Sequence, residues 1–262
     1  MKGVSVNKVD PIAHCLPLEL IILSENQIKR IDAGVYIECE NLLILDLSKN
    51  VLRRIHDNAF SSVKSLTELD VSSNKLDKLY RKIFKPLKAL RKLILHNNQI
   101  VDLPSDLFND LFHLTELDLS YNPLSRLDFR LFDYTIHLET LHLKNANLIK
   151  FHQLTFKNLR RLRFVDLSNN ELIHLGGQTF STNVELVEIR LNNCRLNELG
   201  RHFFDKVNKL EVFQAKENGC VDEVVVGDIV SIRPKFLKCF ENLDLRLERA
   251  RELESAHTGD EL

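Results

Sequence analysis

Hydrophobic residues return along this chain at a fixed interval of 24 residues. Nine successive segments each open with a leucine, without insertion or deletion, at Leu18, Leu42, Leu66, Leu90, Leu114, Leu138, Leu162, Leu186 and Leu210. Numbered from this leucine, positions four, six and eleven are apolar or cysteine in every segment, and position nineteen is Tyr36 and then phenylalanine from Phe60 to Phe204. Such a period predicts a solenoid of stacked repeats, because one repeat alone cannot bury its apolar face.

Each position of the repeat has a physical reason. Positions three to five predict a short strand, in which position four points inward and position five points to solvent. Position nine is asparagine in seven of the nine repeats, and its amide can both donate to and accept from the buried turn after the strand. The exceptions are Ala146 and Cys194. We expect Cys194 to be a buried thiol, and either Asn145 or Asn147 to compensate for Ala146 or the sixth repeat to be locally loose.

The spacing L-x-x-L-x-L-x-x-N/C-x-L is that of leucine-rich repeats. The 24-residue unit with phenylalanine at position nineteen resembles the typical class of extracellular animal proteins, such as Toll-type receptor ectodomains, small proteoglycans and insect leucine-rich immune proteins. The resemblance implies an α/β solenoid, a horseshoe with a parallel β-sheet on its concave face and irregular or short helical convex segments.

The same resemblance implies a function without catalysis, cofactor or metal. A protein ligand or co-receptor would bind the concave face or a flank, in extracellular innate immunity or cell-surface recognition. The alternative is an intracellular scaffold or regulator of an enzyme, which the lack of a secretory signal and of Asn-x-Ser/Thr sequons favours. We expect an extracellular protein whose natural start precedes Met1, with a cytoplasmic location as the alternative.

The pattern divides the chain into four parts. Residues 18–220 hold the nine repeats, and residues 1–17 look like a partial repeat or a truncated cap. Residues 221–240 form the predicted C-terminal cap, in which Val224–Val226 and the isoleucines and valine of 229–232 would close the core. Residues 241–262 form a helical or disordered tail.

Four of the five cysteines are candidates for disulfides. Cys15 and Cys39 occupy position twenty-two of adjacent repeats, so they are near enough to bridge, or else they are two buried thiols. A Cys220–Cys239 bond would resemble a reduced form of the four-cysteine cap of the extracellular family. Closing that loop of about 20 residues would contribute roughly 3 kcal/mol.

Composition narrows the class of partner. A 44% apolar fraction with a net charge of -1 excludes a disordered chain. The 36 basic and 37 acidic side chains leave no basic excess, so we do not expect nucleic acid as a partner. No run of 18 apolar residues would span a membrane.

Candidate ligand-binding residues lie at the solvent-facing positions two, three and five of the strands. One group forms a charged and aromatic mosaic, for which the alternative is a face that neutralises itself; it comprises Lys92, Asp118, His142, Arg163, Phe164, Asp166 and Arg190. A second group is apolar and comprises Leu20, Ile22, Leu43 and Ile44. It predicts an interaction site or dimer contact, unless residues 1–17 cover it. The C-terminal helix is a second candidate dimer contact, and Phe164, Val187 and Val212 are candidates to receive it.

Overall fold

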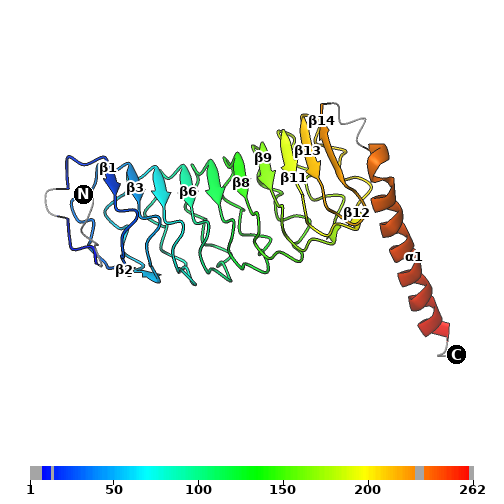
Figure 1. The fold of residues 1–262 in the computed structure, drawn as a ribbon, viewed down its shortest axis with the longest axis horizontal. Helices are drawn as coiled ribbons and strands as arrows, with labels where there is room; N and C mark the ends of the chain where they lie inside the picture. Colours follow the sequence, from blue (N-terminus) through cyan, green and yellow to red (C-terminus); the bar gives the residue numbers. More distant parts are fainter. Residues whose placement is uncertain (1–7, 13–14, 228–232, 260–262) are drawn as a thin grey trace.

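The computed structural model describes residues 8–12, 15–227 and 233–259, the last eight of these by their backbone alone. Successive turns of the chain stack along one axis, with a sheet of ten strands along one side (Figure 1). The strands of this sheet are β1 (Leu20–Ile22), β3 (Ile44–Asp46), β5 (Glu68–Asp70), β6 (Lys92–Ile94), β7 (Glu116–Asp118), β8 (Thr140–His142), β9 (Phe164–Asp166), β11 (Glu188–Arg190), β13 (Val212–Ala215) and β14 (Glu223–Val226). The predicted solenoid with a strand at positions three to five is confirmed.

The register of the sheet follows the sequence period. Strands β1 to β13 pair in parallel, and each residue lies beside the residue 24 positions later, as Ile21 does beside Leu45. Only β14 runs antiparallel to its neighbour, β13. Equivalent positions of successive repeats therefore form straight columns across the sheet.

The opposite side of the solenoid has little regular structure. Two pairs of two-residue strands lie there, β2 (Arg30–Ile31) with β4 (Arg54–Ile55), and β10 (His174–Leu175) with β12 (Glu198–Leu199). Turns and irregular segments make up the rest of this side in the described part of the repeats. The short helices that the resemblance allowed there are absent from that part of the chain.

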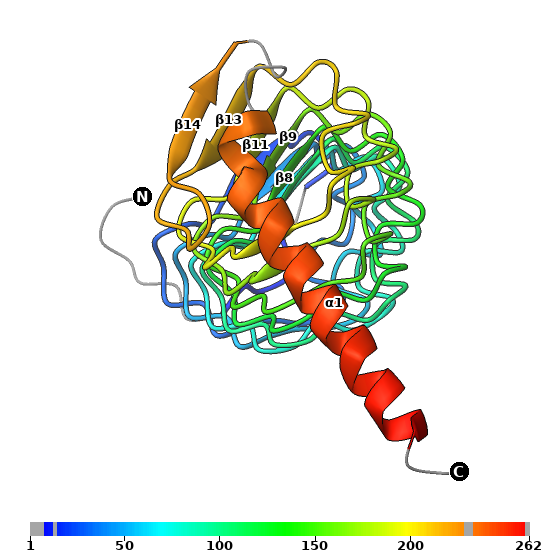
Figure 2. The ribbon, with the colours of Figure 1, turned by 90° about the vertical axis from the view of Figure 1, so that its right-hand side faces the viewer.

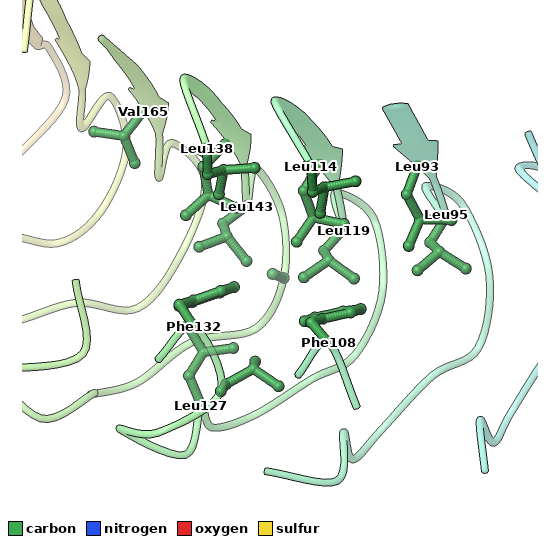
Figure 3. Packing of buried hydrophobic residues seen from close by; sticks show 14 of the residues in the cluster. Leu93, Leu95, Phe108, Leu114, Leu119, Leu127, Phe132, Leu138, Leu143 and Val165 are labelled. Carbon is green, nitrogen blue, oxygen red and sulfur yellow. The ribbon is translucent and has the colours of Figure 1, made fainter. Parts of the chain in front are cut away.

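The core consists of two layers of columns. Figure 3 shows leucines that directly follow the strands, such as Leu119 and Leu143, above the rings of Phe108 and Phe132, which lie side by side. These two rings stack with centroids 6.4 Å apart, and both are almost completely buried. The column ends differently from the sequence pattern, because Phe180 meets Phe203 edge-on at 5.4 Å. Phe203 and the next residue, Phe204, which occupies position nineteen of this repeat, are both buried.

The asparagines at position nine, which we call the asparagine ladder, join neighbouring repeats. The Asn98 amide donates to the carbonyls of Leu95 at 3.0 Å and, in the preceding repeat, Val71 at 3.1 Å. Its oxygen accepts the N–H of Leu76, also in the preceding repeat, at 3.0 Å. One buried side chain thus satisfies backbone groups of two turns.

The two exceptions in the ladder are compensated differently. The Cys194 thiol lies 3.1 Å from the carbonyl of Leu167 and takes the place of an amide donor. Asn145 and Asn147 do not replace the missing amide at Ala146: neither side chain makes a hydrogen bond within the described residues, so this expectation is wrong. The N–H of Leu124, which an asparagine at position 146 would accept, donates instead to the carbonyl of Ala146 at 3.1 Å.

One disulfide lies in the first described repeats, and another links the last repeat to the residues after it. Cys15 and Cys39 are bonded with Cα atoms 4.8 Å apart, and Cys220 and Cys239 with Cα atoms 5.0 Å apart. The fifth cysteine, Cys194, is a buried free thiol.

Aromatic rings close the core at the C-terminal end. Phe236, in the short 3-10 helix η2 (Arg233–Phe236), meets the rings of Phe204 and Phe213 edge-on, each at 5.2 Å. Of the residues predicted to close the core, Val225 is buried, whereas Val224 and Val226 are exposed. Residues 229, 230 and 232 lie outside the described residues. Phe236 was missed because it lies outside the repeat.

A single long helix, α1 (Leu237–Gly259), crosses the C-terminal end of the solenoid, and its far half projects beyond the body (Figure 2). Arg246 forms an ion pair with the largely buried Glu198 of β12 at 2.9 Å, and the Asn242 amide donates to the carbonyl of Asn197 at 2.9 Å. The helix packs against β12, so the prediction that it covers Phe164, Val187 and Val212 is wrong.

We predict that Asn98→Ala lowers the free energy of unfolding by about 2 kcal/mol, because it leaves the buried N–H of Leu76 without an acceptor. Urea unfolding monitored by circular dichroism measures this change. Asn97→Gly is the matched control, because it removes an exposed amide and tolerates the local backbone φ of 54°. An equal loss in both variants would contradict the role of the ladder.

A second prediction concerns Tyr36, whose buried hydroxyl has no hydrogen-bond partner among the described residues. Burial raises its pKa above the ordinary value, so the folded state keeps the proton that the unfolded state loses at high pH. Ionisation of this hydroxyl therefore costs the folded state nothing below about pH 10, and the stability of the protein falls as the pH rises further, because only the unfolded state ionises readily. Tyr36→Phe should raise stability by about 1 kcal/mol at neutral pH and reduce the alkaline loss. The exposed Tyr121→Phe should do neither, as urea unfolding at both pH values would show.

Candidate ligand-binding face

The outer face of the ten-stranded sheet, which we call the sheet face, presents the residues at positions three and five of each repeat. Parallel pairing sets neighbouring side chains in these columns about 4.8 Å apart. The columns therefore bring together residues that are 24 or 48 positions apart in the sequence.

An aromatic cluster lies on the sheet face of repeats six to eight. The half-buried ring of Phe164 lies between the His142 ring, with centroids 5.0 Å apart, and the Arg190 guanidinium, whose carbon is 5.0 Å from the ring centroid. Arg190 also forms an ion pair with Glu188 at 2.6 Å. We call these four residues the aromatic cluster. A cation held over a ring contributes about 0.5–1 kcal/mol at an exposed site, so the cluster is partly preorganised.

The aspartates of the same columns serve the fold. The carboxylates of Asp118 and Asp166 each accept the N–H of the serine two residues later, at 2.9 Å. Asp46 and Asp70 make the same contact at 2.8 Å in earlier repeats. Each of these carboxylates therefore satisfies a backbone N–H in the turn after the strand.

His142 and Arg190 occupy the same repeat position as these aspartates, but their side chains do not accept a backbone N–H of the turn. In the sixth repeat, the serine hydroxyl of Ser120, from the preceding repeat, accepts the N–H of Lys144 at 3.2 Å. Ser168 does the same for Asn192 at 3.3 Å. The backbone of the turn is thus satisfied without the side chains of His142 and Arg190, which are therefore available to meet a ligand.

The other charged candidates are dispersed. Lys92 forms an ion pair with Glu116 at 2.9 Å, and both side chains are about one-third exposed or more. A pair of this exposure adds at most about 1 kcal/mol and neutralises itself. Arg163 is exposed and has no ion pair within the described residues.

The apolar candidates lie at the first edge of the sheet. Leu20 is 50% and Ile22 is 63% exposed on β1, whereas Leu43 and Ile44 are half-buried. Beside them, a shallow pocket of about 210 Å³ is lined by Ile44, Asp46, Glu68, Asp70, Lys92 and Ile94, among others. The apolar group and the aromatic cluster are therefore separate parts of the sheet face.

A larger groove lies outside the sheet face and was missed by sequence reasoning. It has a volume of about 850 Å³ and runs along the flank of repeats three to six, with Phe129 and His152 at one end. Two of its charged side chains, Arg126 and Asp102, form an ion pair with each other at 3.3 Å. The sequence held one sign of this groove: Phe129 stands at a position where the repeat requires no aromatic residue, and it is 42% exposed.

No helix among the described residues combines the length and the apolar character needed to cross a membrane.

The geometry defines a leucine-rich-repeat solenoid. The family model for the leucine rich repeat matches residues 17–76, 88–134 and 136–196, which make up more than half of the chain. The chain belongs to the leucine-rich-repeat family. No curated protein matches it at a significant level.

Solved structures share this fold. Toll in its complex with Spatzle from Drosophila superposes with a TM-score of 0.68 at 21% identity, over 82% of this chain and 32% of Toll. The functional domain of InlJ from Listeria monocytogenes gives 0.62 at 21% identity, over 81% and 42%. The TLR13–ssRNA13 complex gives 0.58 at 25% identity, over 73% and 31%. The chain spans less than half the length of each of these proteins.

Proposed function

We propose that this chain is a non-enzymatic recognition module of an extracellular protein, and that it binds a protein partner on the sheet face of repeats six to eight. The observation that carries the proposal is the position of the half-buried ring of Phe164 between His142 and Arg190 on the sheet face. Neither neighbour is needed by the turns of the fold, as the serine contacts of the adjacent repeats show. Aromatic and arginine side chains are also enriched where protein interfaces concentrate their binding energy.

Two observations support an extracellular location. Both disulfides require an oxidising compartment to persist. The similar Toll structure was solved with Spatzle, so a solenoid of this shape is used by at least one protein that binds another protein. A role in innate immunity or cell-surface recognition rests on this likeness.

The binding proposal is tested with the double variant Phe164→Ala, Arg190→Ala. Native and variant proteins would be immobilised in equal amounts and exposed to extracellular fluid of the source organism, and retained proteins would be quantified by mass spectrometry. Loss of two central residues of an interface should reduce the retention of the partner by tenfold or more. Phe112→Ala is the matched control, because it removes an aromatic ring that is 42% exposed outside the sheet. If the double variant retains the same proteins as the native chain, the sheet face does not carry the function.

The extracellular location is tested by alkylating the protein from its native source. We expect no labelled cysteine in the folded protein, one after unfolding without reduction, and five after reduction. Cys194 stays unlabelled in the folded protein because it is buried, and burial raises the pKa of its thiol to about 12, which keeps it protonated. Five labelled cysteines after unfolding without reduction would favour an intracellular scaffold.

A further inference from the structure

One flank of the solenoid, just after the strands, holds a column of left-handed residues. Position eight of all nine repeats has a positive φ between 51° and 59°, and none of these residues is glycine. They are Glu25, Lys49, Ser73, Asn97, Tyr121, Asn145, Asn169, Asn193 and Glu217. Each is held by its backbone, as Asn145 is by donating its N–H to the carbonyl of Ser168 at 2.9 Å. The side chains of this column therefore have fixed starting points on the flank.

The two breaks in the asparagine ladder change this flank. Where Ala146 or Cys194 replaces asparagine, position ten also becomes left-handed, with φ 54° at Asn147 and 58° at Arg195. Position ten is not left-handed in the other described repeats. The next ladder asparagine then accepts two N–H groups, as Asn170 accepts those of Ala146 and Leu148 at 3.0 and 2.9 Å.

A polar pocket of about 240 Å³ lies where these departures occur. It is lined by five asparagines and one ion pair: Asn145, Asn147, Asn169, Asn170 and Asn193, with Glu171 and Arg195. We call it the amide pocket. Its lining exposes almost no carbon, so an apolar ligand would gain nothing there.

The amide pocket contains side-chain amides that make no hydrogen bond to a described residue, and its two charged side chains are paired with each other. Arg195 forms an ion pair with Glu171 at 3.3 Å, so the two charges offset each other. Asn193 donates to Asn169 across a long 3.4 Å. The amides of Asn145 and Asn147 make no hydrogen bond within the part of the chain that the structure describes. Each unused amide offers two donors and one acceptor oxygen.

An exposed aromatic ring continues the same column. Tyr121 occupies position eight of the repeat before Asn145, and its side chain is 44% exposed. Its backbone N–H donates to the carbonyl of Lys144 at 2.8 Å, which places the backbone of Tyr121 beside the residue that precedes Asn145 of the amide pocket. The negative face of such a ring attracts the weakly positive C–H groups of a ligand that packs on it.

We propose that the amide pocket, together with Tyr121, binds a neutral oligosaccharide. Amides with both donors and acceptors match neighbouring sugar hydroxyls, which also donate and accept. The internal ion pair disfavours a charged ligand, and the ring of Tyr121 supplies the face on which a sugar ring packs. The site is distinct from the sheet face and does not depend on the protein-binding proposal.

The test measures binding of mannohexaose and of the N-acetylglucosamine hexamer to the full chain by titration calorimetry and saturation-transfer NMR. A sulfated heparin hexasaccharide is the charged comparator. We expect one of the neutral probes to bind with a dissociation constant on the order of 1 mM and the sulfated probe to bind more weakly. Ring protons of Tyr121 should show contacts to the bound sugar.

Substitution by glycine separates recognition from folding at this flank. Asn145→Gly with Asn169→Gly removes two amides and keeps a residue that tolerates φ of 52° and 59°, so the fold is retained while binding falls about tenfold or more. Asn97→Gly is the matched control: it changes the same column at φ 54°, outside the amide pocket, and should bind like the native chain. Tyr121→Ala should also weaken binding.

Restoring the ladder provides an independent variant. Ala146→Asn supplies the amide present in most other repeats and should return Asn147 to the ordinary conformation. We expect this variant to be at least as stable as the native chain and to bind the sugar more weakly. Binding that survives in both this variant and the double glycine variant would overturn the proposal, as would the absence of binding by either neutral probe.

A parallel measurement distinguishes sugar chains linked to a protein from free polysaccharide. The glycoprotein ribonuclease B and its deglycosylated form would be compared with free mannohexaose. Binding of the glycosylated form alone would assign the amide pocket to protein-linked glycans. Binding of the free chains alone would assign it to polysaccharide.

Discussion

The hydrogen bonds of the buried asparagine amide are the constraint on which this structure depends. Each strand of the solenoid is followed at once by a turn that buries backbone donors and acceptors, and a ladder residue such as Asn98 satisfies those of two repeats together. An inserted or deleted residue would move that amide away from its partners in the preceding turn. The constant period of 24 residues and the parallel register of the sheet follow from this requirement.

The same requirement distinguishes structural from functional side chains. Asp118 and Asp166 look like ligand-binding residues in a list of solvent-facing positions, yet their carboxylates complete the turns after their own strands. His142 and Arg190 occupy the same column without that task, because a serine of the preceding repeat performs it. On a scaffold of columns, the residue that differs from its neighbours and is not needed by the backbone is the better candidate for recognition.

The repeat made most of the fold predictable and little of the site. Strand positions, the buried phenylalanine column and the thiol of Cys194 all follow from alternation and from the chemistry of position nine. Phe236 could not be assigned to the core from a pattern that ends before it. Nor could the sequence show the groove beside Phe129 or the left-handed turn at Asn147, since both depend on how the backbone relaxes between repeats.

The positions of the two disulfides have a consequence for how the stack would come apart. A solenoid held together by contacts between neighbouring repeats has no long-range ties, so local opening starts at its ends, where each repeat has one neighbour instead of two. Cys15–Cys39 and Cys220–Cys239 cross-link the chain in these two regions. The bonds therefore act against local opening of the repeats that they join, and these repeats should open more often in the reduced chain than in the oxidised chain.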